Sequence, residues 1–547
     1  NQTKKKETVK YNQENITLQA NTPYIINHKL KTEDVRVSML DNKGQVVMGT
    51  TKVLSPNQTE FTPNKDVENA KVTVTGKRDI VETAFTKIMD QVVTVLMMTK
   101  TMSVNYTQSE GTYIPGYKYG TQNFGLYKPF GPTAAPGWPY VLGMIPTNID
   151  SYLQTTEWLV DNPLISEKYK RTYSNQLRVQ TSLEPIKSMR ITLNADRSFS
   201  KNETRYLQGD AQQNKNNALI GGNFTMSYNT IATSFNSDKA YEQFKENRVI
   251  IANRLIEKNI GQEYELDPIS GYPVLYKETS QDVLIPAFLS AYSGQNPNDV
   301  YLNDYFVPMF SSFKDFVRTL NWRLSYNGLS KVAYVKDYFK SININHAYTS
   351  NYNLGAYETF TAETVFEDDF FVDRVDGALY LSPQYNVSNI SISERFNPII
   401  GVDAKLVNNM TAKFEVRSNR NVSLSFRNTE ISETAGLEYV VGGGYVFKNF
   451  KVNINTANGK QSYENDLNIR MDLSIRKNQT IRRNIVEDIT RKISGNNMYS
   501  LKTYADYMLN ERFTIRLYLD YSMNKPLTNG YKTSSLNGGV NLRFSLM

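Results

Sequence analysis

Few residues of this chain are of the type and spacing that acid–base or metal chemistry needs. Cysteine is absent from the 547 residues, and only His28 and His346 carry an imidazole. No H-E-x-x-H, G-x-S-x-G or P-loop motif occurs. The one dense group of carboxylates lies in EDDFFVDRVDG, at Glu367, Asp368, Asp369, Asp373 and Asp376. This group lacks the EF-hand spacing, so we interpret it as a solvated acidic loop.

The histidines and the glycine run have structural interpretations. We expect His28 to be a surface residue, and His346 to be a structural residue or one that faces a lumen. The run Gly442-Gly443-Gly444 lies in a strand-like segment, without the helix that a phosphate-binding loop requires. It indicates a bend or a close backbone approach. The sequence therefore predicts no enzyme, no cofactor and no metal site.

What the sequence does contain is strict alternation. In LNIRMDLSIR, residues 467–476, every apolar residue is followed by a polar one. A β-strand with this pattern has one apolar face and one hydrated face. We count roughly fourteen to sixteen candidate strands of this kind after residue 90, with helical periodicity nearly absent. Residues 244–256 are the main ambiguous stretch.

The chain is predicted to have two parts. Residues 1–80 contain short alternating runs around turn residues, which predict a small β-sandwich module and a linker. The longer alternating strands of residues 81–547 predict an outer-membrane β-barrel. Long irregular insertions are expected at about 111–170, 257–319 and 349–387, and loops of that length are usually functional. The fold class is therefore all-β, with a transmembrane antiparallel barrel.

Lipid is the favoured environment of the apolar face. Residues 513–521 span roughly 26 Å at about 3.3 Å per residue, near the apolar band of an outer-membrane barrel once the strand is tilted. Aromatic residues at both ends suit the two membrane interfaces. We predict these lipid-facing residues: Leu467, Ile469, Met471, Leu473, Ile475, Phe513, Ile515, Leu517 and Leu519. We predict these lumen-facing residues: Lys413, Glu415, Arg417, Asn468, Arg470, Asp472, Arg476, Arg516 and Asp520.

Turn lengths and composition add to this prediction. Residues 509–512 are expected to form a short periplasmic turn, and 477–498 and 522–538 to hold longer outer loops. The formal net charge of +8 comes from scattered basic residues, which argues against nucleic acid as a partner. No apolar run reaches the roughly 20 residues of a transmembrane helix.

Several long blocks resemble one protein family. They are PGWPYVLG (136–143), DVLIPAFLSAYSG (282–294), NWRLSYNGLSKV (321–332), FKSININHAYTSNYNLG (339–355), FNPIIGVDAKLVNNMTAKFEV (396–416) and NDLNIRMDLSIR (465–476). In this order they resemble the SprA/Sov family, the giant outer-membrane translocon of the type IX secretion system of Bacteroidota, which also serves gliding motility. The resemblance covers most of the chain, and LQANTPYIINHKLKTEDVRV (18–37) belongs to it.

The resemblance implies that residues 81–547 are the C-terminal part of a giant outer-membrane β-barrel. It also implies a function and a set of partners. Such translocons pass folded cargo proteins with a C-terminal β-sandwich signal through a wide hydrated lumen to the cell surface. The implied partners are the remaining N-terminal part of the same translocon, a PorV-type shuttle barrel at a lateral opening, a periplasmic plug protein, secreted cargo proteins and outer-membrane lipid. The implied location is the bacterial outer membrane, integral, with periplasmic and extracellular loops.

One insertion is unusually aromatic. Residues 111–146 hold candidates for a gate or for contact with a partner: Tyr117, Tyr119, Phe124, Phe130, Trp138 and Tyr140. A loop core packed only on itself explains the same composition. For the whole chain, two other classes remain open, an outer-membrane nutrient transporter or porin-like barrel and a soluble β-sandwich surface adhesin.

Overall fold

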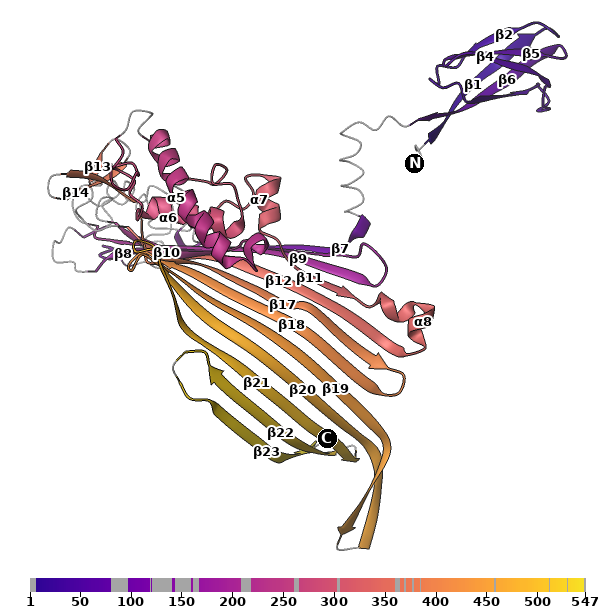
Figure 1. Cartoon of the computed structure of the whole chain (residues 1–547). Coiled ribbons are helices and arrows are strands. Elements are labelled where there is room, and N and C mark those ends of the chain that lie inside the picture. Colours follow the sequence, from indigo (N-terminus) through magenta and orange to yellow (C-terminus); the bar gives the residue numbers. More distant parts are fainter. Residues whose placement is uncertain are drawn as a thin grey trace. The chain divides into compact units, whose positions relative to one another are not determined.

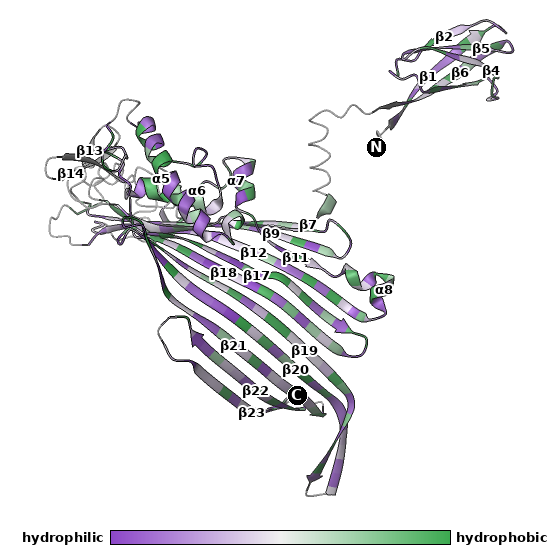
Figure 2. Ribbon diagram, viewed as in Figure 1, coloured by the Kyte–Doolittle hydropathy of each residue, from purple (hydrophilic) through white to green (hydrophobic). Residues whose placement is uncertain are grey.

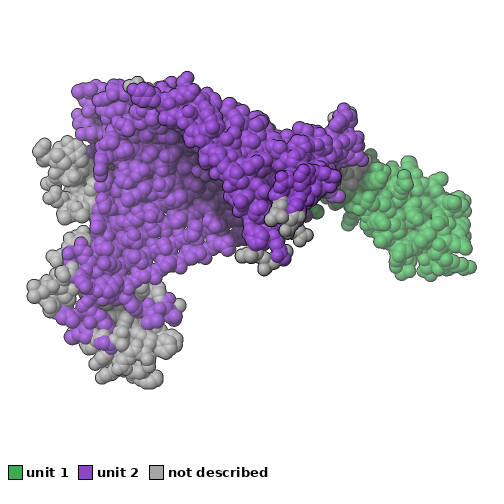
Figure 3. Space-filling model, turned by 90° about the horizontal axis from the view of Figure 1, so that it is seen from below, with its two compact units in different colours: residues 1–97 green, residues 98–547 purple. Residues whose placement is uncertain are grey.

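The computed structural model describes most of the chain in two compact units, residues 1–97 and 98–547, which Figure 3 colours separately. The described residues are 6–79, 97–118, 120, 140–142, 159–160, 167–207, 218–259, 265–302, 305–359, 365–367, 370–375, 378–383, 385–456, 459–510, 512–528 and 530–545.

Unit 1 is a small β-sandwich, as the sequence predicts. One sheet has the strand order β1-β6-β3 and the other β2-β5-β4. The strands are β1 (Lys6–Leu18), β2 (Tyr24–Asn27), β3 (Val35–Leu40), β4 (Gly49–Ser55), β5 (Gln58–Pro63) and β6 (Val67–Asp79). The core between the sheets is formed by side chains that include Ile26, Met39, Phe61, Val72 and Val74.

The surface position expected for His28 is wrong. Its side chain is buried in unit 1, where Nε2 lies 3.0 Å from the Thr59 hydroxyl. Nδ1 accepts a hydrogen bond from the backbone N–H of Leu30 at 3.2 Å. Burial lowers the pKa of the imidazole, because burial disfavours its charged form. Both ring nitrogens are thus occupied by structural contacts.

Unit 2 is dominated by one antiparallel sheet of 14 strands, which confirms the predicted fold class. Its main path runs β23-β22-β21-β20-β19-β18-β17-β12-β10-β9-β8-β7, with β11 and β16 off this path. The strands are β7 (Thr99–Tyr113), β8 (Tyr169–Leu183), β9 (Met189–Arg205), β10 (Leu219–Ser227), β11 (Asn321–Tyr326), β12 (Phe339–Glu358), β16 (Asn386–Val387), β17 (Asn389–Leu406), β18 (Met410–Ser425), β19 (Glu430–Thr456), β20 (Gly459–Asn484), β21 (Ile489–Asn510), β22 (Phe513–Pro526) and β23 (Thr533–Phe544).

The sheet is a curved wall that borders a hollow (Figure 3). Within the described residues, β7 and β23 each pair with one strand only and form its two edges (Figure 1). A separate three-stranded sheet contains β13 (Val365–Glu367), β14 (Phe370–Val375) and β15 (Ala378–Ser382). It includes the backbone of part of the acidic stretch, while Asp368, Asp369 and Asp376 lie outside the described residues.

Four loop predictions need correction. β22 continues to Pro526 and β23 begins at Thr533, so most of 522–538 is strand and not an outer loop. β20 continues to Asn484 and β21 begins at Ile489, so most of 477–498 is strand and not an outer loop. β12 reaches Glu358, so the insertion predicted at 349–387 begins later. β7 and β8 likewise occupy the two ends of the insertion predicted at 111–170. The short turn predicted at 509–512 is confirmed, since β21 ends at Asn510 and β22 begins at Phe513.

Helices occupy part of the segments that are predicted to be irregular. Between β10 and β11 lie η2 (Ile231–Thr233), α5 (Ser237–Asn259), α6 (Gln281–Ser293) and α7 (Phe313–Arg318), and between β11 and β12 lie η3 (Gly328–Lys331) and α8 (Ala333–Lys336). The near absence of helix and the irregular insertion at 257–319 are therefore wrong. We call residues 228–320 the helical module. Figure 1 shows α5 and α6 over one end of the sheet.

The helical module is built on two helices of different character. In α5 the buried residues include Tyr241, Phe244, Ile251 and Leu255, a stripe that repeats at helical spacing. α6 is apolar nearly all round and is buried from Val283 to Tyr292. None of the helices in the described part of the chain has the length and apolarity to cross a bilayer.

The core of unit 1 supports a stability prediction. Ile26 is 0% exposed and Ile25, its neighbour on β2, is 50% exposed. Ile26→Ala should lower the free energy of unfolding of residues 1–97 by about 2–5 kcal/mol, because it leaves a cavity between the sheets. Ile25→Ala, the matched control, should change it by less than about 0.5 kcal/mol. Urea unfolding followed by circular dichroism measures both, and equal effects would contradict this core.

Candidate functional site

The two faces of the large sheet are the feature that carries chemistry in unit 2. Cross-strand pairing brings the predicted lipid-facing residues into common rows. Leu473 of β20 pairs with Val441 of β19 and with Leu501 of β21. Leu517 of β22 pairs with Ala505 of β21 and with Val540 of β23. Since paired residues point to the same side of a sheet, these side chains share one face.

The apolar residues of this face are exposed over a wide area. We call this surface the apolar band; its exposed members include Phe414, Tyr439, Val441, Met471, Leu473, Ile475, Leu517, Leu519, Tyr521, Leu536, Val540 and Leu542. Leu467, Ile469, Phe513 and Ile515 are half-buried in the same rows. Figure 2 shows how hydrophobic residues recur along these strands. An uncovered surface of this size is rare in a protein surrounded by water.

The opposite face is hydrated and charged, and the predicted lumen-facing residues lie on it. Lys413 Nζ lies 2.9 Å from a carboxylate oxygen of Glu415, which also pairs with Arg417. Arg470 Nε lies 3.2 Å from Asp472 Oδ2. Asn468, Arg476, Arg516 and Asp520 occupy alternate positions of the same face on β20 and β22. Positive and negative charges thus neutralise one another locally, and the face has no strong field of one sign.

Sequence reasoning missed several partners on the charged face. Arg516 Nε donates to Asp506 Oδ1 at 2.5 Å, and Arg417 Nη1 lies 3.6 Å from Glu438 Oε2. Asp506 and Glu438 sit at alternating polar positions of their strands, which is a signal that the sequence does carry. Their partners depend on strand register, and one sequence does not reveal that register.

Glycines make room on the charged face. A Cβ atom at Gly442 would lie 2.1 Å from Asp472 Oδ1, so the glycine permits the carboxylate to lean across β19. The close approach expected at 442–444 is therefore confirmed there. Beside it lies an open cavity of about 260 Å³ whose lining includes Asn343, Asp403, Lys413, Gly442 and Arg470. Its charged and amide side chains suit water.

Two buried ion pairs attach the helical module to the sheet. Arg420 of β18 lies 3.0 Å from Glu394 of β17, and both are buried. From the module, the Thr230 hydroxyl donates to Glu394 at 3.0 Å, and Arg420 donates to the carbonyl of Thr233 at 2.6 Å. These contacts tie η2 and its flanks to two neighbouring strands.

The second pair lies under the start of α5. Arg483 of β20 is buried and donates to Glu433 of β19 and to Asp238 of α5, each at 2.8 Å. Ser237 also donates to Glu433. A buried charge without a partner costs several kcal/mol, so each pair fixes the helical module at one position on the sheet.

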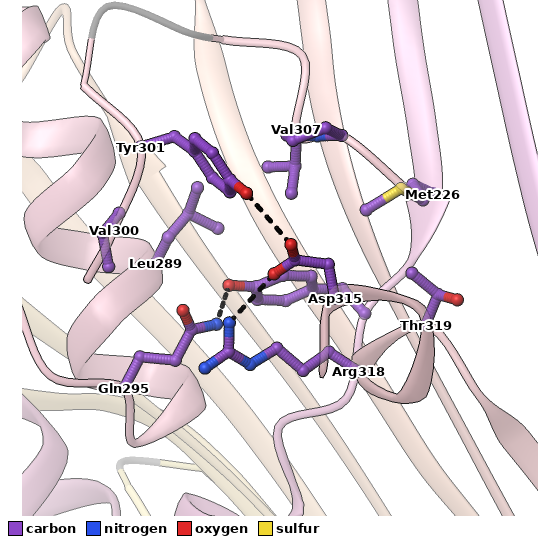
Figure 4. A pocket seen from close by; sticks show the side chains of 11 residues that line it. Met226, Leu289, Gln295, Val300, Tyr301, Val307, Asp315, Arg318 and Thr319 are labelled. Atoms are coloured by element: carbon purple, nitrogen blue, oxygen red, sulfur yellow. Dashed lines mark hydrogen bonds and ion pairs between the residues drawn. The ribbon is translucent and has the colours of Figure 1, made fainter. Parts of the chain in front are cut away.

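A small pocket inside the helical module is lined by Met226, Tyr228, Leu289, Gln295, Val300, Tyr301, Val307, Pro308, Asp315, Arg318 and Thr319 (Figure 4). Its volume of about 20 Å³ is room for one water molecule. Its polar side chains are joined to one another. Tyr301 donates to Asp315 at 2.9 Å, and Arg318 donates to the same carboxylate at 3.2 Å. We assign this pocket a structural role.

Electrostatics in the pocket agree with that role. Burial alone would raise the pKa of the Asp315 carboxyl, but hydrogen bonds from Ser312, Ser311 and Tyr301 outweigh burial. The charge of Arg318 acts in the same direction, and the pKa of Asp315 lies below its ordinary value. The carboxylate is thus held ionised, and its partners leave it no role as a proton donor.

The remaining candidate residues are placed as follows. His346 lies in β12 on the face of the apolar band, with Nδ1 2.5 Å from the carbonyl oxygen of Ile399. In the aromatic insertion, Tyr140 donates to the carbonyl of Thr112 at 2.6 Å, and Tyr117 forms a bridge with Leu159. Tyr119, Phe124, Phe130 and Trp138 lie outside the described residues.

The chain matches no protein-family model and no curated protein. Among solved structures it is similar to the β domain of the Bordetella autotransporter BrkA, with 7% identity over 69% of this chain and 92% of that chain, at a TM-score of 0.20. It is also similar to OmpT, an outer-membrane protein of Vibrio cholerae, with 10% identity over 81% of this chain and 99% of that chain, at 0.18. At such TM-scores neither likeness contributes to the functional argument.

The attachment of the helical module can be tested at Arg420. Arg420→Met leaves the buried carboxylate of Glu394 without its cation, which should destabilise the seated module by about 3–5 kcal/mol. Protease cleavage between residues 228 and 320 should accelerate accordingly. The matched control is Arg417→Met on the same strand, because Arg417 is partly exposed on the charged face and its loss should cost about 0–1 kcal/mol. Equal cleavage rates of the two variants would refute the attachment.

Proposed function

We propose that this chain forms part of the wall of a very large outer-membrane β-barrel, the protein-conducting translocon of a type IX secretion system. The observation that carries the proposal is the division of the sheet into an exposed apolar band and a continuous charged face. Lipid covers the apolar band, and the charged face lines a hydrated passage. This arrangement is typical of membrane barrels, whose strands alternate apolar-out and polar-in.

The open edges of the sheet support a barrel larger than the described wall. In hydrocarbon every backbone N–H and C=O needs a partner, so sheets that cross a membrane must close. Among the described strands β7 and β23 each pair with one neighbour, and in the proposed barrel further strands pair with their outer edges. The diameter of a barrel grows with its strand number, so a main path of 12 strands that further strands extend would enclose a wide lumen.

The chemistry of the charged face supports protein cargo. Charges of both signs lie in pairs such as Lys413 with Glu415 and Arg470 with Asp472. A hydrated surface without a dominant sign does not select one ion, and it tolerates diverse folded proteins. The kind of cargo rests on the resemblance to the SprA/Sov family. The cargo would be secreted proteins with a C-terminal β-sandwich signal.

The same resemblance supplies the proposed partners. They are the N-terminal part of the same translocon, which would complete the barrel, a PorV-type shuttle barrel at a lateral opening and a periplasmic plug protein. A nutrient transporter or porin-like barrel shares the two-faced wall and is the main rival. A soluble adhesin does not account for the exposed apolar band of unit 2.

A pair of adjacent substitutions tests the orientation of the wall. Leu473→Arg should destabilise the assembled barrel by about 2–4 kcal/mol, because it places a charge near the bilayer midplane. Ser474→Arg introduces the same side chain one residue away on the charged face, where Ser474 donates to Glu438 at 2.9 Å, and should be nearly silent. Urea-resistant protein recovered in the outer-membrane fraction measures both. Equal tolerance would contradict the proposed facing.

The transport function needs a separate experiment. In a strain that lacks this protein, cargo with the C-terminal signal should accumulate in the periplasm and disappear from the medium, while uptake of small nutrients stays unchanged. Complementation with the Ser474→Arg variant should restore secretion. Normal secretion together with a loss of nutrient uptake would favour the porin-like alternative.

A further inference from the structure

The helical module lies on the same side of the sheet as the apolar band. In β18, Phe414 belongs to the exposed band and Leu424 is buried in the core of the module. The two are ten residues apart, and the pairing of β18 with β19 runs between them without a register shift. Since an even separation in a regular strand keeps the same side, the face that meets lipid also carries the module.

The border between band and module is aromatic. The ring of Trp322 in β11 lies 4.6 Å from that of Tyr348 in β12, which lies 4.8 Å from that of Phe396 in β17. Phe235, from the segment between η2 and α5, stacks on Phe396 at 5.3 Å and is 69% exposed. An aromatic group of the module therefore adjoins the aromatic residues of the wall.

Further apolar residues of the module are uncovered, several of them on or next to α7. Phe313 is 82% exposed and lies one turn before the exposed Val317 on α7. α7 leads directly into β11, whose Trp322 belongs to the aromatic border, and in Figure 1 it lies on the side of α5 and α6 nearer β11. Ile231 and Phe310 are also exposed. We call Ile231, Phe235, Phe310, Phe313 and Val317 the rim.

We propose that the rim is a membrane-docking surface that rests in the interface of the bilayer, with Phe235 and Phe313 in contact with lipid. The inference rests on the proposed function, because it requires the apolar band to be covered by hydrocarbon. A module seated outside the wall, next to that band, must overhang the membrane surface. Aromatic side chains next to an aliphatic band are what the interface favours. Because the rim continues the apolar band, the surface that covers it is lipid and not a protein partner.

These 547 residues contain no cysteine, so an introduced cysteine is the only thiol in this part of the barrel and can be labelled there. Single cysteines replace Phe235, Phe313, Leu473 or Ile269 in the complete barrel, and each is labelled with the dye NBD. Ile269 is the matched control in the module, since it is 96% exposed. Ile269 follows the C-terminal end of α5. The first turn of α5 contacts Arg483 through Asp238, and Lys245 of the next turns contacts Asp488. Each labelled barrel is reconstituted into vesicles of phosphatidylethanolamine and phosphatidylglycerol. The vesicles contain nitroxide-labelled lipids as quenchers and no other protein.

The labels at 235 and 313 should show blue-shifted emission, quenching of roughly twofold by nitroxides near the headgroups, and protection from aqueous iodide. The label at 269 should be quenched by iodide alone. Iodide quenching at 235 and 313, with the label at 473 quenched by nitroxides deep in the acyl chains, would overturn the docking surface and indicate a site for a protein. A label at 473 that iodide reaches would overturn the proposed function itself.

Discussion

The fixed alternation of side chains along a β-strand is the constraint on which unit 2 depends. A residue in a regular strand cannot change sides without a bulge. β19 and β20 pair without a register shift from Phe447 with Leu467 to Glu430 with Asn484. The face that is apolar and exposed near Leu473 is therefore the face that lies under α5 near Arg483. In the proposed wall, one alternating pattern faces lipid, packed helices and water in different parts of the same strands.

Charge pairs have different physical roles on the two faces. On the charged face, pairs such as Arg516 with Asp506 are partly exposed, and water screens them, so each adds little stability. Under the module, the pairs of Arg420 with Glu394 and of Arg483 with Glu433 are almost completely buried. There the cost of breaking a pair is large, although the pair itself need not stabilise the fold more than apolar packing would. The buried pairs therefore specify where the module sits.

The sequence predicts the parts of this fold that depend on local pattern alone. The alternation of 467–475 identifies a strand and its two faces, and the short apolar runs before residue 80 identify the sandwich. It fails where contacts distant in the chain decide the outcome. Residues 477–484 are polar and turn-like in isolation, but the pairing with β19 and the cover of α5 extend the strand. His28 is polar but fills an interior position beside Thr59.

Two helices that were not predicted, α5 and α6, do have helix signals in the sequence. The stripe of Tyr241, Phe244, Ile251 and Leu255 repeats at helical spacing, and the apolar residues of 282–292 are flanked by Ser280 and Gly294, typical helix boundary residues. The ion-pair partners had no such signal, because Asp506 and Glu438 find their arginines through register. Local periodicity thus predicts faces, and long-range pairing decides which charged groups meet on them.

The length of the strands explains why the wall needs the helical module at one end only. β19 has 27 residues and β20 has 26, whereas a transmembrane strand needs about 9–11. In the proposed wall, most of each strand therefore lies beyond the hydrocarbon. At one end both strands turn polar, with Lys451 3.3 Å from Glu464, and water can cover them. At the other end apolar residues such as Ile431 continue on the face of the apolar band, and the packed helices keep water from them.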